Sequence, residues 1–441
     1  MNDTIVAVAT PPGEGGIGVL RLSGPDAARI AESLAGPMPP ARRAVHRRFH
    51  AADGTILDDG LLLHFPAPNS YTGEDVVELQ GHGGPQTLAL LQRALEAAGA
   101  RAARPGEFTE RAYLSGRMDL AQAEAVADLI GAATAEAARA ARRSLDGELT
   151  QRVQSLQDAL TTLRVHVEGA LDFADEDVDW LADAGIRRQL AELVAGFDAL
   201  LADLERGRRL TEGMTVVLAG RPNAGKSTML NRLAAREAAI VTEQPGTTRD
   251  ALREAVSLAG VPVTLIDTAG LRDTGDPIEA EGVRRAREAM AEADAICFLV
   301  DAEAGLTDAD RTLLEQLPAG PRCLCVASRS DRLPPGASPG FDAIAVSALT
   351  GDGLPELIEA LVGSGASSAS PGLSARVRHL RALADARAAL ESARGRIEQG
   401  DDAGLAAEEL RQSQQALQAI TGGVHSDELL GEIFRRFCIG K

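Results

Sequence analysis

The residues that could do chemistry are concentrated first in the stretch GRPNAGKS, residues 220–227. It fits the pattern G-x-x-x-x-G-K-S, in which backbone amides surround the phosphates of a nucleotide. In this pattern Lys226 would reach the β- and γ-phosphates and the Ser227 hydroxyl would ligate Mg²⁺. The stretch follows the apolar run MTVVLA and precedes the helical pattern STMLNRLAA, which is the context such a loop requires. The spacing therefore predicts a site for a nucleoside triphosphate.

Two further motifs complete the expected phosphate site. The sequence DTAG, residues 267–270, ends the apolar run VTLI, so Asp267 could hold Mg²⁺ through water and the Gly270 amide could meet the γ-phosphate. The sequence GTTRD, residues 246–250, lies between these motifs, and Thr248 could ligate Mg²⁺ only when a γ-phosphate is present. A ligand that depends on the γ-phosphate predicts a nucleotide-dependent switch.

The residues expected to read the base depart from the usual pattern. GTPases of this class carry Asn-Lys-x-Asp after the next strand, whereas this chain has SRSD at residues 328–331. Asp331 keeps a carboxylate that can accept two hydrogen bonds from the guanine edge, and Arg329 can lay its stem on the base plane. Because Ser328 lacks the amide of Asn, we expect weaker bracing and affinity with guanine preference retained. The last loop is expected at Ser347, Ala348 and Leu349, where a backbone amide would face the guanine oxygen.

The residues alone leave the hydrolytic group open. A Ras-like site places Gln directly after the DTAG glycine, but this chain has Leu271, which cannot orient water. A monovalent cation held by the Asn223 amide oxygen could replace an arginine finger. The next segment offers four alternative carboxylates for positioning water, which are Asp273, Asp276, Glu279 and Glu281.

Composition limits the classes of protein to consider. A chain of 441 residues predicts two to four domains, and its net charge of −19 argues against coating nucleic acid through phosphate attraction. Contact with RNA would then be local or shared with a partner. The four cysteines form no disulfide framework, and the chain has neither a basic, apolar leader nor a long apolar run. We therefore expect a cytosolic chain that does not cross a membrane.

Changes in sequence texture divide the chain into four segments. Residues 1–118 alternate short β-type runs with Gly and Pro turns, which predicts an α+β domain, and residues 119–212 have helical spacing throughout. Residues 213–371 alternate strand-like and helical runs, which predicts a parallel sheet with crossover helices. A linker rich in Gly, Ser and Pro at 363–374 precedes helical residues 372–441. This order predicts an α/β domain inserted into one helical domain.

The motifs and their flanks resemble the tRNA modification GTPase MnmE (TrmE) family. GRPNAGKSTMLNRL, AAIVTEQPGTTRD and DTAGLRDTGDPIEAEGVRRA resemble its GTPase domain. The resemblance extends over essentially the whole chain through ATPPGEGGIGVLRLSG, NSYTGEDVVELQGHGG, ARPGEFTERAYLSGRMDLAQAEAVADLI and FCIGK. It implies an N-terminal α+β domain with a folate-binding-like fold that also dimerises, an α-helical domain, and an inserted Ras-like α/β P-loop GTPase domain.

The resemblance also implies an activity. A homodimer would work with the flavoprotein MnmG, in a heterotetramer or larger complex, to add an aminomethyl or carboxymethylaminomethyl group to the wobble uridine of certain tRNAs. The one-carbon unit would come from 5,10-methylene- or 5-formyl-tetrahydrofolate, FAD would be bound only by the partner, and Mg²⁺ and K⁺ would support GTP hydrolysis. Two alternatives are a ribosome-assembly GTPase switch and a folate-dependent aminomethyltransferase with a regulatory G domain.

Site residues follow from the resemblance position by position. It implies that Glu279 is the catalytic carboxylate and that K⁺ is held by Asn223 and by main-chain oxygens of Thr242, Gln244 and Thr247. It implies a folate site at Arg21, Glu78, Arg117 and Lys441. The full set expected to bind GTP is Asn223, Ala224, Gly225, Lys226, Ser227, Thr228, Thr242, Glu243, Gln244, Pro245, Gly246, Thr247, Thr248, Asp267, Thr268, Ala269, Gly270, Ser328, Arg329, Asp331, Ser347, Ala348 and Leu349.

The four cysteines and one cluster of arginines are further candidates for a functional role. A nearby cation could lower the thiol pKa of Cys438 and make it a catalytic one-carbon or redox participant, with simple packing as the alternative. We expect Cys297, Cys323 and Cys325 in the core. The cluster Arg42, Arg43, Arg47 and Arg48 could touch tRNA, but a solvated loop is the preferred interpretation.

Overall fold

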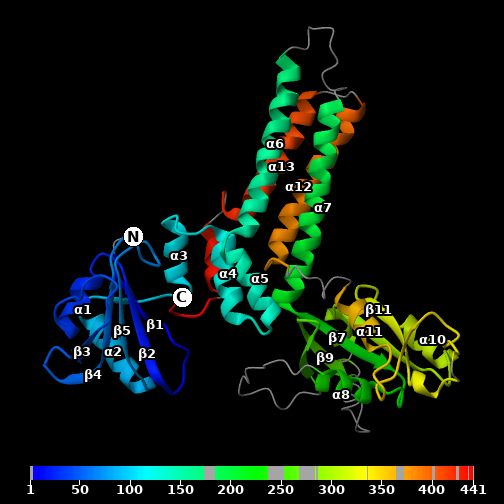
Figure 1. Cartoon of the computed structure of the whole chain (residues 1–441), viewed down its shortest axis with the longest axis horizontal. Helices are drawn as coiled ribbons and strands as arrows, with labels where there is room; N and C mark the ends of the chain where they lie inside the picture. Colours follow the sequence, from blue (N-terminus) through cyan, green and yellow to red (C-terminus); the bar gives the residue numbers. More distant parts are fainter. Residues whose placement is uncertain are drawn as a thin grey trace. The chain divides into compact units, whose positions relative to one another are not determined.

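The computed structural model describes residues 3–172, 184–236, 253–267, 284, 287–334, 336–363, 372–399, 403–423, 427–435 and 437–440. The chain divides into two compact units, of which one is Met1–Ala127 with Gln418–Lys441 and the other is Asp128–Leu417 (Figure 1). Each unit is built on its own six-stranded sheet.

The first unit contains a mixed sheet in the order β3-β4-β5-β2-β1-β6, antiparallel except for the β1 and β6 pair. Alternation along β2 sends Leu20 and Leu22 into a core with helices α1 and α2, and Arg21 toward the opposite face. The elements are β1 (Ile5–Val8), β2 (Gly15–Ser23), α1 (Ala27–Ala35), β3 (Val45–His50), β4 (Ile56–Phe65), β5 (Val76–Gly83), α2 (Pro85–Ala97), β6 (Arg101–Ala102), α3 (Glu107–Leu114) and α14 (Asp427–Arg435).

The C-terminal segment packs onto the N-terminal part of the chain within this unit. Phe434 and Phe437 form an apolar cluster with Leu120 and Ala123. Further on, a side chain added at Gly440 would lie 2.2 Å from the Val8 carbonyl oxygen, so the segment runs directly over the end of β1. The two ends of the sequence therefore build one unit.

The helical part of the chain contains α4 (Leu120–Gly131), α5 (Ala135–Leu145), α6 (Glu148–Asp172), α7 (Ala184–Glu212), α12 (Val377–Gln399) and α13 (Ala403–Thr421). Figure 1 shows α6, α7, α12 and α13 as long helices lying side by side. Arg387 of α12 forms an ion pair with Asp198 of α7, and the Gln414 amide donates to the Thr161 hydroxyl at 2.7 Å. Helices from before and after residues 213–371 thus pack together.

The second sheet has the order β12-β11-β10-β7-β9-β8. The five strands expected from the sequence pair in parallel, and the additional strand β8, which was not expected, pairs antiparallel with β9 at the edge. Its elements are β7 (Met214–Gly220), α8 (Lys226–Arg236), β8 (Arg253–Leu258), β9 (Val261–Asp267), β10 (Ala295–Asp301), α10 (Asp308–Glu315), β11 (Arg322–Ser328), β12 (Ile344–Val346) and α11 (Leu354–Val362).

Two further expectations need correction. Arg47 and Arg48 lie on strand β3, not in a solvated loop, because β3 pairs with β4 along its whole length. The end of the expected linker is packed: Leu373 and Ser374 are buried, and a side chain added at Gly207 of α7 would overlap the Leu373 carbonyl. Only a glycine on α7 lets the chain pass there.

Candidate functional site

The P-loop connects β7 to α8 and encloses a buried lysine. Gly220 has a φ of +134°, and a side chain there would lie 2.4 Å from the Leu299 carbonyl oxygen, so the tight turn requires glycine. Lys226 begins α8 and is only 5% exposed. Its Nζ donates to the carbonyl oxygens of Gly220 and Arg221 at 2.9 and 2.8 Å. The loop therefore holds the ammonium group at the N-terminus of a helix, where anions bind.

Ser227 and Asp267, the two expected magnesium residues on described elements, meet at the end of β9. The Ser227 hydroxyl donates to Asp267 Oδ2 at 2.7 Å, and Asp267 is fully buried. A hydroxyl and a carboxylate are the hard oxygen ligands that Mg²⁺ prefers. In the part of the chain that the structure describes, no group of three or more His, Cys, Asp or Glu side chains could hold a metal ion alone. The donor set thus fits a magnesium ion that also takes oxygens from a phosphate.

The loop expected to read the base contacts the P-loop through Ser328. Ser328 is 2% exposed, and its hydroxyl donates to the Ala224 carbonyl at 2.7 Å. The shorter side chain therefore still connects the two loops. Asp331 accepts from the Ser347 hydroxyl at 2.6 Å, which joins the base-reading loop to the last loop of the site.

Arg329 has a partner that the sequence did not indicate. Its φ is +59°, and its guanidinium donates to the Asp301 carboxylate at 2.6 Å. This contact connects the ends of the neighbouring strands β10 and β11. In the last loop, Leu349 is strongly exposed, while Ala348 packs against the core of the sheet.

Several expected site residues lie outside the described ones. Asn223 is described: it is exposed, with a φ of +65°, and Thr228 is exposed on α8. Gly225 is also described, with a φ of +88°. The members outside the described residues are Thr242, Glu243, Gln244, Pro245, Gly246, Thr247, Thr248, Thr268, Ala269, Gly270, Glu279 and Lys441.

In the N-terminal unit, Arg21 and Glu78 are neighbours across strands β2 and β5. Arg21 Nε donates to Glu78 Oε1 at 3.0 Å. The guanidinium carbon lies 5.5 Å from the Tyr71 ring centre and 5.9 Å from that of Phe108, which are cation–π distances. The Tyr71 hydroxyl in turn pairs with Thr109 at 2.9 Å, and burial raises the pKa of this phenol.

Tyr71 and Phe108 lie in segments that resemble the family, but the sequence did not predict that these two residues belong to the site. Their residue type could have indicated them, because aromatic residues make up only 3% of the chain. Two other expected residues lie in the same unit. Arg117 is exposed, and its Cγ is 3.5 Å from the position of a side chain added at Gly73. Cys438 is exposed, and its carbonyl accepts from the Gly106 amide at 3.4 Å.

A buried cluster of ion pairs is centred on Arg111 of α3. Arg111 is 1% exposed as a side chain and contacts Asp3, Glu74 and Glu107 at 2.9 to 3.2 Å. Burial by itself would raise the pKa of Glu107, but hydrogen bonds from Arg101 and from the backbone hold it below its ordinary value. The cluster fixes α3, which carries Phe108, to the start of the chain.

The cysteines divide differently from the expectation. Cys297 is buried, as predicted, and burial raises its pKa to about 12. Cys323 is exposed and Cys325 partly exposed, so placing both in the core was wrong. The reason is that β12 pairs only with the last three residues of β11, which leaves the start of β11 at an open edge. The thiol of Cys323 lowers the pKa of Cys325 to about 7 through a hydrogen bond.

Two family models match most of the chain. Residues 4–117 match a family model described as GTP-binding protein TrmE N-terminus, and residues 120–438 match the MnmE helical domain. Among solved structures, Era from Aquifex aeolicus matches at 24% identity with a TM-score of 0.28, over 40% of this chain and 66% of that chain. No helix among the described residues is both long and apolar enough to span a bilayer.

Relatives named tRNA modification GTPase MnmE match from end to end. The protein from Alkalilimnicola ehrlichii is 52% identical over 99% of both chains. Those from Nitrosococcus oceani and Methylococcus capsulatus are each 48% identical, over 100% of this chain and 98% and 99% of theirs. With both family models matched and about half of all residues shared over the full length, the chain belongs to the MnmE family of tRNA modification GTPases.

Proposed function

We propose that this chain hydrolyses GTP and uses the cycle to drive modification of the wobble uridine in tRNA. One observation carries the proposal: the phosphate loop and the base-reading loop are joined by the hydrogen bond from Ser328 to Ala224, so triphosphate and guanine sites form one unit. Lys226 supplies positive charge for the phosphates, and Ser227 with Asp267 supplies oxygen ligands for Mg²⁺. Bound Mg²⁺ neutralises charge that develops on the phosphates during hydrolysis.

The chain's own residues account for the choice of nucleotide. Asp331 presents a carboxylate that can accept from the N1–H and 2-amino groups of guanine, whereas adenine offers no such pair of donors. Ser347 orients this carboxylate at 2.6 Å, and the Asp301 carboxylate fixes Arg329 beside it. For hydrolysis itself, we propose K⁺ stimulation, with Asn223 as a ligand and Glu279 positioning water, as in the family resemblance.

The finer function includes folate chemistry, a homodimer and the flavoprotein MnmG. The Arg21–Glu78 pair supports a folate site, because a carboxylate can read a pterin edge and nearby cations such as Arg117 can meet a glutamate tail. The C-terminal segment at Cys438 lies in the same unit and would bring Lys441 to this site. The net charge of −19 supports a design in which contact with tRNA is shared with the partner.

Steady-state hydrolysis of GTP and ATP in K⁺ and in Na⁺ buffer tests the GTPase. We expect hydrolysis selective for GTP and stimulated by K⁺, and loss of activity in Lys226→Ala. Equal use of ATP would overturn the guanine assignment, and an equal rate in Na⁺ would overturn the role of K⁺. Mass spectrometry of tRNA nucleosides from a strain lacking the gene tests the pathway, because unchanged wobble uridine would exclude the proposed substrate.

A further inference from the structure

The chain passes from the helical bundle into the GTPase sheet through a tight turn. Helix α7 ends at Glu212, and the chain passes through Gly213 into β7. Gly213 has a φ of +72°, and a side chain there would lie 2.8 Å from the Pro262 carbonyl oxygen on β9. The chain leaves the sheet again after α11, where the Arg209 guanidinium of α7 donates to the Val362 carbonyl at 2.6 Å. Both points lie at the end of α7, so a contact away from this end is needed to fix the direction of the sheet.

Such a contact lies between the β8–β9 turn and the start of α5. The Thr134 hydroxyl donates to the Gly260 carbonyl at 2.7 Å and accepts from the Ala137 amide at 3.1 Å as the N-cap of α5. Ala137 and Ala140 of α5 are buried in the same apolar cluster as the strands of the sheet. Gly260 has a φ of +85°, and a side chain there would lie 2.4 Å from Glu136 Cγ. The turn is therefore seated closely on α5.

Strand β9 connects this contact to the magnesium residues. It begins at Val261, next to the turn, and ends at Asp267, which binds Ser227. Five consecutive residues of β9 pair with β7 and six with β8, so the strand is held from both sides. Seven residues at about 3.3 Å each extend over roughly 20 Å. A strand held in this way moves as one piece, so a shift at Asp267 reaches the Thr134 contact.

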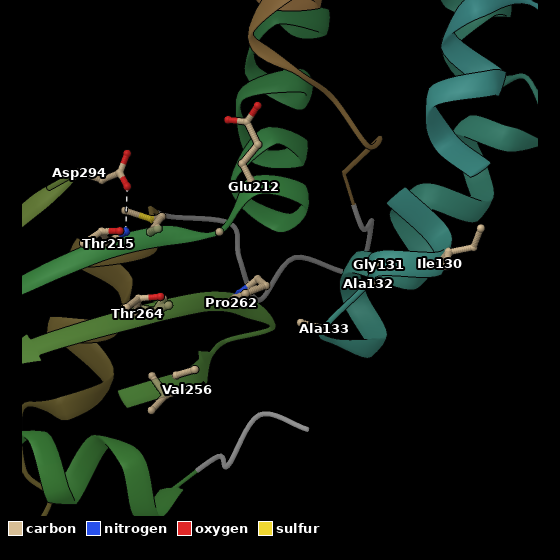
Figure 2. Close-up of a pocket in the computed structure, with 14 residues that line it drawn as sticks. Ile130, Gly131, Ala132, Ala133, Glu212, Thr215, Val256, Pro262, Thr264 and Asp294 are labelled. Carbon is tan, nitrogen blue, oxygen red and sulfur yellow. Dashed lines mark hydrogen bonds between the residues drawn. The ribbon is translucent and has the colours of Figure 1, made fainter. Parts of the chain in front are cut away.

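A cavity next to the contact leaves space for such movement. It has a volume of about 370 Å³ and lies between the start of the strands and the turn that joins α4 to α5. Figure 2 shows Thr215, Pro262 and Thr264 on the strand side and Ala132 and Ala133 on the opposite side. Since closely packed interiors resist displacement, a cavity at this point allows the turn and the sheet to change their spacing.

We propose that Thr134 is a positioning residue of the GTPase cycle, whose hydroxyl ties the β8–β9 turn to α5 and transmits the state of the Asp267 site to the helical bundle. This inference rests on the proposed function and deepens it, because it names the contact that would couple nucleotide hydrolysis to work elsewhere in the chain. Such couplings between sites amount typically to a factor of about 5 to 150.

Three substitutions separate the two roles of the hydroxyl. Thr134→Ser keeps both the donor and the helix cap and should behave as the original protein. Thr134→Asp keeps a good cap but has only acceptor oxygens when ionised, so it loses the bond to Gly260. Thr134→Val loses both. Thr312→Asp, on the exposed face of α10, controls for the added negative charge.

A second pair of substitutions tests the same contact without changing the cap. Gly260→Ala introduces a methyl group that displaces the Glu136 side chain and thereby lifts the turn from α5. Glu136→Gly removes the obstruction. If the close contact between the β8–β9 turn and α5 is required, the double variant Gly260→Ala/Glu136→Gly recovers coupling relative to Gly260→Ala alone. The backbone strain at position 260 is the same in both proteins and therefore cancels in this comparison.

The measurement is hydrogen–deuterium exchange of α5 amides in the full chain, with GDP and without nucleotide, together with GTP turnover. In the original protein and in Thr134→Ser, we expect GDP to change exchange at residues 135–145 by roughly 5-fold or more. In Thr134→Asp and Gly260→Ala, we expect a change below about 2-fold with turnover retained within about 2-fold. The inference is overturned if α5 of the original protein ignores GDP, or if Thr134→Asp responds fully.

A readout in cells keeps this inference distinct from the proposed function. In a strain lacking the gene, the original gene should restore the modified wobble uridine, while Thr134→Asp restores several-fold less per GTP hydrolysed. If the original gene restores nothing, the proposed function fails. If both genes restore equally, only the role of Thr134 fails.

Discussion

Replacing Ser328 with Ala removes one hydroxyl from the junction of the two nucleotide loops. The side chain is 2% exposed, and its hydroxyl donates to the Ala224 carbonyl at 2.7 Å and lies 3.2 Å from the Val300 carbonyl. Deleting a buried donor leaves its acceptor unsatisfied, which costs about 1–3 kcal/mol. The methyl group of Ala fits the same space, so we expect no steric change.

The expected effect is a weaker hold on the nucleotide without a change of base. If about 1–2 kcal/mol of this cost falls on the bound state, GDP affinity decreases by roughly 5- to 30-fold. Asp331 and Ser347 remain, so the ratio of affinities for GDP and ADP should stay constant.

Equilibrium titration with a fluorescent GDP analogue, with ADP as competitor, measures both quantities. Ser330→Ala is the matched control, since Ser330 is the same residue type two positions along and is less buried. Binding of GDP within 2-fold of the original protein would refute the bracing role of Ser328. A fall in selectivity for guanine would show that Ser328 contacts the base and does not act through the P-loop.

The remaining predictions concern charge and thiol reactivity. Asp331→Asn should lose GTP and gain XTP, because the amide donates where the carboxylate accepted, and hydrolysis assays with both nucleotides check this. Arg111→Met should lower the melting temperature strongly, since breaking a buried ion cluster costs about 3–5 kcal/mol. Because the pKa of Glu107 is lowered in the folded protein, its ionised form stabilises the fold above the ordinary carboxyl pKa, and this stabilisation is lost as the pH falls below that value. Between pH 6 and pH 3, the melting temperature should therefore decrease more steeply for the original protein than for Arg111→Met. Iodoacetamide at pH 7 should label Cys325, with a pKa of about 7, far faster than Cys297, with a pKa of about 12, as peptide mapping would reveal.

The parts of the fold that were predictable depend on local signals. The P-loop motif specifies its own turn and helix start, and apolar runs such as AICFLVD correspond to buried strands over the predicted residues. Strand β8 was missed because REAVSL mixes polar and apolar residues, and its antiparallel direction depends on β9 beside it. Strand β3 was missed because only Phe49 is buried among its six residues.

The sites show the same limit. Short motifs predicted Lys226, Ser227 and Asp267 as phosphate and magnesium residues, because each motif is contained in a few consecutive residues. The pairing of Arg21 with Glu78 connects residues 57 positions apart and depends on the register of two strands, which only the fold specifies. The Thr134 contact depends on a residue 126 positions away and on a glycine in the partner turn.

The return of the C-terminal segment to the first sheet has a consequence for synthesis. The unit that contains Arg21 and Glu78 needs residues from 418 onward, and roughly 290 residues of the other unit are translated in between. At about 5–20 residues per second, the ribosome takes roughly 15–60 s to supply them. During this time the end of β1 lacks the segment around Gly440, while the GTPase sheet, which is contiguous in sequence, can already form. The unit that contains Arg21 and Glu78 is therefore completed last, so a chain whose translation is aborted can carry a folded GTPase sheet but not a complete N-terminal unit.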